Sequence, residues 1–296
     1  MHTVVAGGTG FLGTALTSAL INAGHEVSVL TRTPRAANHV HWDPTNPLAS
    51  WPDVIGRADA VINLAGEPLN ARRWTTARKQ ALRRSRIVAT QALVSAIRRA
   101  TKRPLFLSGS AIGFYGTDRH EALDEGSSHG SDFLADLCVE WEQTARGAEP
   151  VTRVVLLRTG VVLASEGGAF PELARPFKFF AGGPIASGRQ VVSWIHVDDW
   201  VGMTLWALEN AQVAGPLNLT APNPVTNAEL AKAIGHAVHR PSFVPAPAFA
   251  VRLLVGEMAD AAILNGQCVI PAKAQSLGYQ FVHPTIDNAV KQIARR

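Results

Sequence analysis

Residues 4–13 read VVAGGTGFLG, and this stretch decides the fold. It joins a short apolar strand to a glycine-spaced turn, which leads into an apolar helix expected over residues 12–23. In the spacing G-x-x-G-x-x-G, Gly7 permits a tight turn, Gly10 lets backbone N–H groups approach a pyrophosphate, and Gly13 lets the helix pack close to the strand. Because the glycines stand between a strand and a helix, the stretch predicts a dinucleotide phosphate site rather than a turn without a ligand.

The second strand, expected over residues 26–30, indicates which dinucleotide binds. Enzymes that use NAD place Asp or Glu at the end of this strand, about 20 residues past the glycines, to bind the ribose hydroxyl. Here the chain reads Thr31-Arg32-Thr33-Pro34-Arg35. Arginine offers paired planar donors to a ribose 2′-phosphate, so the sequence predicts NADP(H) as cofactor. In the alternative interpretation, Arg32 and Arg35 are solvated loop residues.

Strands and helices alternate through about residue 160, which is typical of a parallel sheet covered on both faces. Near-continuous apolar runs at 60–66, 105–108 and 154–158 predict buried strands. We therefore expect an α/β fold, a doubly wound Rossmann sheet with a smaller C-terminal substrate lobe. The expected boundaries are 1–165 for the NADP-binding domain, with 188–220 returning to it, and 166–296 for the lobe. Ligands bind outside the carboxyl ends of such strands, in a crevice lined by Gly66, Ser108, Gly109, Ser110, Thr159 and Gly160.

Composition excludes several functional classes. The chain has 296 residues, of which 47% are hydrophobic, and no apolar stretch is long enough to span a bilayer. The first expected strand begins next to Met1, so we expect no signal peptide, no membrane and a cytoplasmic location. The two cysteines match no metal spacing, which predicts no metal. The net charge of +5 includes a cluster of basic residues at 72–86, which we assign to the solvated face of an amphipathic helix rather than to nucleic acid.

Longer motifs carry a resemblance to a known family. They are GGTGFLG at 7–13, NLAGEPL at 63–69, RRWT at 72–75, SGSAIGFYG at 108–116, DFLADLCVEWE at 132–142, RTGVVL at 158–163, GRQVVSWIHVDD at 188–199 and GPLNLTAPNPVTNAEL at 215–230. The chain resembles the extended and atypical short-chain dehydrogenase/reductases. Within them it is similar to the epimerase-family oxidoreductases that carry the label nucleoside-diphosphate-sugar epimerase. Residues 256–281 resemble a C-terminal extension typical of that group.

The resemblance implies an NADP(H) site along the crevice. Its expected members are Gly7, Gly10, Phe11, Leu12, Gly13, Thr31, Arg32, Leu64, Ala65, Gly66, Glu67 and Ser108, with Arg72 reaching a phosphate and Val161 near the nicotinamide. A carboxylate among phosphates is repulsive unless it is paired, so we expect Glu67 to pair with Arg72 or Arg73. In the alternative, Glu67 caps the segment that follows it.

The catalytic pattern of the family is incomplete. Short-chain reductases use a serine to polarise the substrate oxygen, and a Y-x-x-x-K element to exchange the proton. Ser110 matches that serine, but Phe133 and Leu137 occupy the register of the tyrosine and lysine, and neither can donate a proton. Tyr115, five residues past Ser110, is the expected surrogate acid; the alternative is that it packs in its turn.

Substrate recognition departs from the family as well. Related epimerases hold the substrate diphosphate with an arginine four residues before the histidine of IHVDD, and this chain has Val192 there. Arg175, Lys178 and Arg189 could compensate, or they are surface charges. His196, Asp198 and Asp199 fit an acid–base set, but their spacing equally predicts a helix N-terminus at which an aspartate satisfies free N–H groups.

Two functions follow. The first is an NADP(H)-dependent oxidoreductase or epimerase acting on a small carbonyl, hydroxyl or sugar-nucleotide-like substrate, as a monomer or homodimer. The second is a non-catalytic NADP(H)-binding regulatory protein, such as a redox sensor or a protein with a role in cell division.

Overall fold

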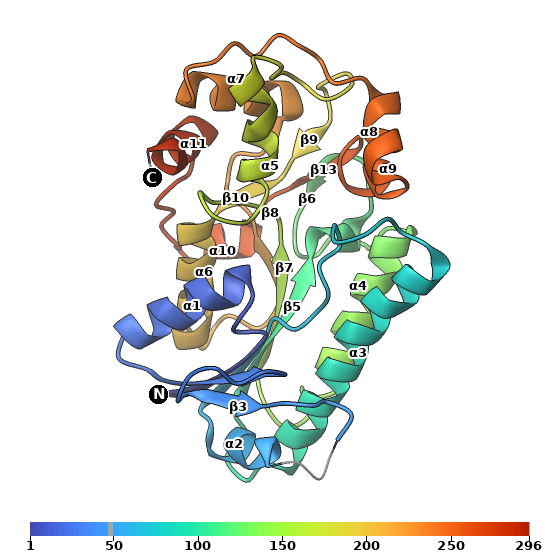
Figure 1. Cartoon of the computed structure of the whole chain (residues 1–296). Coiled ribbons are helices and arrows are strands. Elements are labelled where there is room, and N and C mark those ends of the chain that lie inside the picture. The colour runs from blue at the N-terminus through green and yellow to red at the C-terminus, as the bar shows by residue number, and fades with distance from the viewer. Residues whose placement is uncertain (47–49, 296) are drawn as a thin grey trace.

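A seven-stranded sheet forms the centre of the computed structural model, which describes residues 1–46 and 50–295. All strand pairs in this sheet are parallel, in the order β11-β7-β5-β4-β1-β2-β3 (Figure 1). The strands are β1 (His2–Ala6), β2 (Glu26–Thr31), β3 (His39–His41), β4 (Ala60–Asn63), β5 (Leu105–Ala111), β7 (Val154–Thr159) and β11 (Gly215–Leu219). The predicted α/β class with a Rossmann-like parallel sheet is confirmed.

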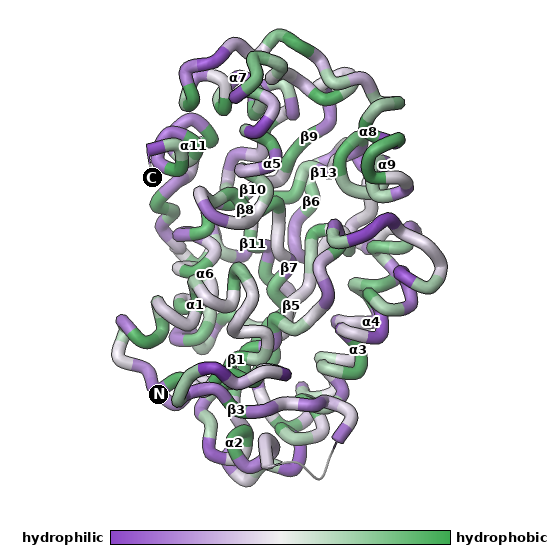
Figure 2. The backbone as a smooth tube through the Cα atoms, viewed as in Figure 1, coloured by the Kyte–Doolittle hydropathy of each residue, from purple (hydrophilic) through white to green (hydrophobic). Residues whose placement is uncertain are grey.

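Apolar side chains on both faces of the sheet explain why these segments are strands. Val5 of β1 packs with helices α1 (Phe11–Asn22) and α6 (Val197–Glu209) on one face, whereas the adjacent Val4 packs on the opposite face. The helices on that second face are α2 (Trp51–Arg57), α3 (Thr76–Arg99) and α4 (Phe133–Arg146). Because side chains alternate along a strand, one apolar run contributes to both cores. In Figure 2 hydrophobic stretches, drawn in green, lie among the central strands.

The strand expected over residues 60–66 ends early, at Asn63. The Asn63 side chain accepts a hydrogen bond from the backbone N–H of Ala65, at 3.2 Å, and donates one to Thr90 of α3, at 2.9 Å. The N–H of Leu64 still donates to the Ala6 carbonyl of β1, whereas the N–H of Ala65 donates to the Asn63 side chain instead of to a neighbouring strand. Residues 64–67 consequently leave the sheet as a loop at its carboxyl edge.

A second group of elements lies beyond the carboxyl ends of the strands and has a core of its own, which includes Trp194, Leu230 and Val290. Its helices are α5 (Phe170–Ala174), η2 (Arg175–Phe179), α7 (Asn227–Ala237), α8 (Ala248–Val255), α9 (Met258–Ala262) and α11 (Ile286–Ala294). Its paired strands are β8 (Val161–Leu163) with β10 (Trp194–His196), β9 (Val191–Val192) with β12 (Val225–Thr226), and β6 (Asp118–Leu123) with β13 (Gly266–Val269).

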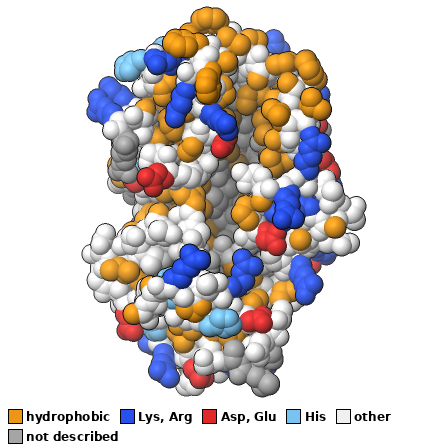
Figure 3. All heavy atoms as spheres, in the orientation of Figure 1, with side chains coloured by type: hydrophobic (Ala, Val, Ile, Leu, Met, Phe, Trp, Pro, Cys, Tyr) orange, Lys and Arg blue, Asp and Glu red, His pale blue; other side chains and the backbone are white. Residues whose placement is uncertain are grey.

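The chain passes between the two parts several times. After β10 it returns to the sheet through α6 and β11, and after β13 it returns through α10 (Ala272–Ser276), whose Ala274 lies in the core beside α6. The parallel pairing of β6 with β13 joins residues from both halves of the sequence. Figure 3 shows a hollow between the two parts, with Lys and Arg side chains along its rim. Among the described residues, no helix has the length and apolar character needed to cross a membrane.

Candidate functional site

Glycines set the path of the chain between β1 and α1. Gly7 has φ +80°, in the left-handed region, and a Cβ built on it would lie 2.7 Å from the carbonyl carbon of Leu64 and 2.9 Å from the nitrogen of Ala65. A Cβ on Gly13 would lie 2.2 Å from the Gly7 oxygen. On Gly10 the Gly7 oxygen alone lies within 4 Å, at 3.4 Å, so the outer side of that residue is open. The turn is thus tightly packed at Gly7 and Gly13 and open beside Gly10.

The N-terminus of α1 lacks a side-chain cap. Its N-cap is Gly10, and its first turn contains no acidic residue. Side chains accept hydrogen bonds from the first turns of some other helices, namely Thr75 for α3, Asp132 for α4 and Thr226 for α7, whereas α8 and α11 also lack such a cap. The first N–H groups of a helix have no intrahelical acceptor and carry partial positive charge, which attracts an anion. Together with the open side of Gly10, they form a cradle that fits a pyrophosphate.

The loop after β8 lies against Phe11, the first residue of α1. Gly167 and Gly168 have φ +76° and +62°, and a Cβ on Gly167 would lie 2.5 Å from Cδ2 of Phe11. Leu12, the next residue of α1, packs against the core beside α6. Val161 begins β8 as a half-buried residue. The structure therefore brings Phe11 next to Gly167 and Gly168, whereas Leu12 and Val161 pack against two different hydrophobic cores.

Thr31 and Arg32 stand at the end of β2, next to the turn. Ala6 and Leu30 are partners in the β1–β2 register, so the two strands end at the same edge of the sheet. Arg32 is exposed, and no described carboxylate pairs with it. The Thr31 hydroxyl accepts a hydrogen bond from the Thr33 N–H at 3.3 Å. An exposed guanidinium at this edge can reach a phosphate on the adenosine ribose.

Glu67, in the loop 64–67, has a different partner from the one that the sequence predicted. Its carboxylate pairs with Arg78 of α3, so the predicted pairing with Arg72 or Arg73 was wrong. The reason is the start of α3, where Arg78 also donates to the Pro68 carbonyl at 2.5 Å. Arg73 instead donates to the Leu253 carbonyl in α8. Arg72 is exposed, in the segment that leads to α3.

A buried polar network occupies the position of the predicted catalytic groups. The Ser110 hydroxyl donates to Oε1 of Glu142 at 2.7 Å, and Glu142 forms two hydrogen bonds with Arg158, at 2.7 and 2.8 Å. Arg158 of β7 lies beside Ser110 of β5 in register, and its Nη1 donates to the Tyr115 hydroxyl at 2.9 Å. That hydroxyl donates to Oδ1 of Asn218 at 2.7 Å. These five residues are at most 4% exposed, and they connect three strands with α4 and with η1 (Ile112–Tyr115).

The network favours a packing role for Tyr115. Its side chain is fully buried, its hydroxyl has two partners, and burial raises the pKa of the phenol. A general acid needs hydrogen-bond reach to the substrate oxygen, which a phenol enclosed in this way does not have. Ser108 is also fully buried, with its hydroxyl directed to the Gly109 carbonyl at 3.4 Å. Ser108, predicted to line the crevice, and Tyr115, predicted as the acid, are therefore both enclosed by the protein.

Aromatic and apolar groups fill the register of the absent tyrosine and lysine. Phe133, the first residue of α4, makes an edge contact with Trp74, with 5.4 Å between ring centroids. Lys79 lies over the Phe133 ring, 5.1 Å from its centroid, and pairs with Glu257 at the start of α9. Leu137 is buried in the second turn of α4. The structure therefore places no proton donor on α4 at either register position.

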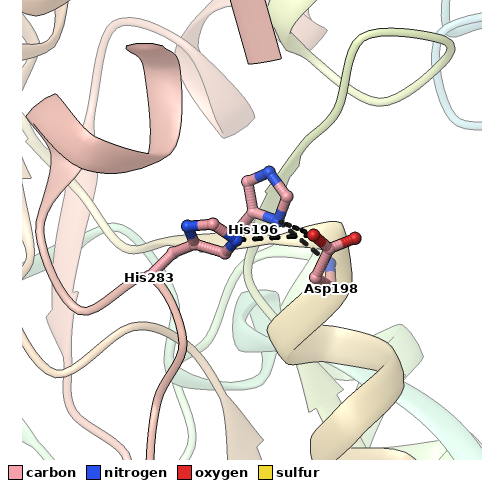
Figure 4. A group of neighbouring side chains, drawn as sticks. All are labelled: His196, Asp198 and His283. Carbon is pink, nitrogen blue, oxygen red and sulfur yellow. Dashed lines mark hydrogen bonds and ion pairs between the residues drawn. The ribbon is translucent and has the colours of Figure 1, made fainter. Parts of the chain in front are cut away.

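His196, Asp198 and His283 form a compact group at the start of α6 (Figure 4). Asp198 lies 3.6 Å from His196 and 3.4 Å from His283. Nδ1 of His196 accepts the helix N–H of Asp198 at 3.0 Å, and Nε2 lies 2.9 Å from the Gln292 amide oxygen. Both nitrogens of His196 are engaged in hydrogen bonds, and His283 contacts the Asp198 carboxylate, so interactions within the protein account for this group.

The group caps the N-terminus of α6. The capping side chain is that of His196, and not that of Asp198 or Asp199 as the sequence predicted. Asp199 has a different partner, because its carboxylate accepts the N–H groups of Val282 and His283, both at 2.8 Å. The group thus fixes the C-terminal segment to α6.

Comparison with known proteins identifies the family. Residues 3–219 match the NAD dependent epimerase/dehydratase family, and residues 246–293 match a domain of unknown function, DUF1731. The chain belongs to the NAD dependent epimerase/dehydratase family. This epimerase-family chain is 42% identical over 294 residues to an epimerase family protein of Mycobacterium leprae, covering 99% of this chain and 95% of the relative. The predicted family resemblance, including its C-terminal extension, is confirmed.

Two solved structures of epimerase-family proteins are similar along the whole chain. The human epimerase family protein SDR39U1 (isoform 2), solved with NADPH, is 38% identical, with a TM-score of 0.92 and 100% of both chains covered. The nucleoside-diphosphate sugar epimerase from Corynebacterium glutamicum is 33% identical, with a TM-score of 0.83, covering 99% of this chain and 58% of that one.

Several site residues of this epimerase-family chain were missed from sequence. They are Glu142, Arg158 and Asn218. One signal was present, because Arg158 interrupts the apolar run VVLLRT and a charged side chain in a buried strand requires a buried partner. That partner is 16 residues earlier, on the inner face of α4.

Proposed function

We propose that this protein binds NADP(H) across the carboxyl ends of β1, β2 and β4, and uses it as an oxidoreductase on a small carbonyl or hydroxyl compound. The observation that carries the proposal is the uncapped start of α1 above an open Gly10. This cradle fits the pyrophosphate of a dinucleotide, because backbone N–H groups and a helix dipole converge on an anion there.

The position of Arg32 supports the phosphorylated cofactor. Arg32 follows β2 without a described carboxylate partner, and residues 31–35 contain no acidic residue that would bind the ribose of NAD. The human relative, which was solved with NADPH, supports the same choice. The 2′-phosphate would lie against the Arg32 guanidinium, with Thr31 beside it.

In the reaction, the residues of this chain bind the cofactor, orient it and shield its phosphates from water. The nicotinamide, when bound, supplies or accepts the hydride. The loop after β8 lies against Phe11, at the start of α1, and would shield the phosphates there. Ser110 holds Glu142 in place, and with Phe133 and Leu137 on α4 no side chain there can exchange the proton. The substrate proton would therefore pass through water or the substrate itself.

A second function is favoured by one specific observation. The groups in the catalytic register are either apolar, as Phe133 and Leu137 are, or already hydrogen-bonded inside the protein, as Ser110 and Tyr115 are. This arrangement suits a non-catalytic protein in which bound NADP(H) orders a surface for a partner. Such a protein would change its partner affinity with NADPH and oxidise no substrate.

Titration with NADPH and NADH, followed by tryptophan fluorescence, tests the cofactor site. Wild type should bind NADPH at least about tenfold more tightly, a gap of roughly 1.4 kcal/mol. Arg32→Glu should remove this preference and leave NADH affinity nearly unchanged, whereas Arg84→Glu, at an exposed position of α3, makes the same charge change and should retain it. An unchanged NADPH to NADH ratio in Arg32→Glu would reject the role of Arg32.

A panel of small aldehydes, ketones and alcohols then separates the two functions. Turnover, measured as a change in nicotinamide absorbance, supports the oxidoreductase. Tight NADPH binding without turnover on the panel, together with a partner interaction that depends on NADPH, supports the regulatory protein.

A further inference from the structure

Arg86 lies beside the loop 64–67 of the proposed cofactor site, although no sequence motif marks it. It comes from the middle of α3 and crosses the end of β4, where a Cβ on Gly66 would lie 3.2 Å from both its Cγ and its Cζ. Its Nη2 donates to the Glu67 carbonyl and its Nη1 to the Leu82 carbonyl, both at 3.1 Å. Its guanidinium also lies 5.3 Å from the centroid of the Trp141 ring. The side chain is therefore held in one place beside the loop 64–67.

The charge of Arg86 has no matching carboxylate. Both of its hydrogen-bond acceptors are neutral carbonyls, and no carboxylate of the described chain forms an ion pair with it. The nearby Glu67 carboxylate is bound by Arg78. Arg158 provides a contrast within the same protein, because it is more deeply buried than the half-buried Arg86 and has two hydrogen bonds to Glu142. Burial lowers the pKa of Arg86, as expected for a cation removed from water without a counter-ion.

The fold indicates which half of the cofactor Arg86 faces. In a doubly wound sheet each mononucleotide half lies over one set of strands, and the pyrophosphate lies at the point where the strand order reverses. Arg32 at the end of β2 marks the adenosine half. The strands on the other side of β1 are β4, β5 and β7, so Gly66 and Arg86 belong to the nicotinamide half.

We propose that Arg86 makes the site prefer the reduced cofactor, NADPH, over the oxidised form, NADP+. The inference rests on the proposed NADP(H) site. The oxidised nicotinamide ring carries a positive charge and the reduced ring is neutral. A fixed cation that lacks a counter-ion repels the oxidised ring and leaves the reduced ring unaffected, and low solvent access strengthens this repulsion. Arg86 is thus a specificity-determining residue for the redox state of the bound nucleotide.

Equilibrium binding of NADPH and of NADP+ to the full-length protein tests the proposal without any substrate. Wild type should bind NADPH at least about tenfold more tightly than NADP+. Arg86→Gln should reduce this ratio several-fold, chiefly by tightening NADP+ binding. Arg86→Lys keeps the charge and should retain most of the ratio. Arg84→Gln removes a charge from an exposed position two residues away and should not change it.

The outcomes distinguish this inference from the function on which it rests. Equal affinity of wild type for both forms, or an equal loss of both in Arg86→Gln, would overturn the redox preference while the NADP(H) site stands. Failure of wild type to bind either form would reject the proposed function itself. If Arg86→Gln does not fold, Arg86→Met keeps the apolar stem against Gly66 and Trp141 and gives the same comparison. An unchanged ratio in that variant would also overturn the proposal.

Discussion

Arg158 of β7 and Glu142 of α4 form a two-pronged ion pair, with hydrogen bonds of 2.7 and 2.8 Å between side chains that are only 3% and 4% exposed. Buried ions of this kind are stable only together, because each is costly to remove from water. Ser110 and Tyr115 attach to the pair, one to each member. The pair therefore anchors the two residues, Ser110 and Tyr115, that the sequence predicts to be catalytic.

Replacing Glu142 tests the anchor. Glu142→Gln should destabilise the protein by about 3–5 kcal/mol, because Arg158 would remain buried without its counter-ion. Urea unfolding measures the change. Glu140→Gln, two residues earlier on α4, breaks the more exposed pair with Arg83 and should cost less than about 1 kcal/mol. Similar losses in the two variants would contradict the special role of the buried pair.

Tyr115→Phe separates packing from proton transfer. Loss of the hydroxyl leaves Asn218 and Arg158 each short of one hydrogen bond, and should cost about 1–3 kcal/mol of folding stability. NADPH affinity should stay the same, because the hydroxyl is enclosed in the protein. If a substrate is found, its turnover should survive the substitution. Abolished turnover with unchanged stability would restore Tyr115 as the acid.

Gly13→Ala should damage the glycine turn. Its methyl group would lie 2.2 Å from the Gly7 oxygen, a contact with backbone that cannot be relieved by a rotamer change. We expect a stability loss of about 3 kcal/mol and weaker NADPH binding. Gly56→Ala in α2 is the control, since no atom lies within 4 Å of the added carbon and alanine favours a helix by up to about 1 kcal/mol. Thermal unfolding with and without NADPH measures both effects.

We expect the free energy of unfolding to depend on pH through His196. Burial, and then the neighbouring His283, lower the pKa of its imidazole below the ordinary value of 6.5. The unfolded chain therefore binds a proton at a higher pH than the folded chain does. Stability should fall as the pH drops below about 6.5, and the fall should end once the folded imidazole is also protonated. His196→Asn keeps a capping side chain and should flatten this part of the profile.

Urea unfolding at a series of pH values measures the effect of His196. His236→Gln, at an exposed position at the end of α7, serves as the control. A profile for His196→Asn that matches the wild-type profile would assign the acid sensitivity to other groups.

The sequence predicted the parts of the site that depend on local structure. Gly7 and Gly13 could be assigned because a turn between strand and helix requires them whatever the rest of the chain does. The partners of Glu67 and Ser110 could not be assigned, because each depends on where a distant helix places one side chain. Arg78 is 11 residues from Glu67, and Glu142 is 32 residues from Ser110. Register within a helix decides such contacts, and composition does not encode it.

The position of Arg86 could not be predicted from the sequence either. In the sequence it is one of several basic residues on a helix with a solvated face, and nothing separates it from Arg83 or Arg84. Its special position arises because Gly66 has no side chain at the point that the guanidinium crosses. The relation between a glycine in a loop and an arginine 20 residues later becomes visible only in three dimensions.

The pairing of β6 with β13 has a consequence for how the chain acquires its structure. Residues 118–123 find their strand partner at 266–269, more than a hundred residues later. During synthesis the N-terminal sheet can assemble early, but the edge of β6 stays open until nearly the whole polypeptide has emerged. An unpaired strand edge invites association with other chains. Shortened forms that end before β13 should therefore aggregate as they are made, even though they contain every glycine of the nucleotide turn.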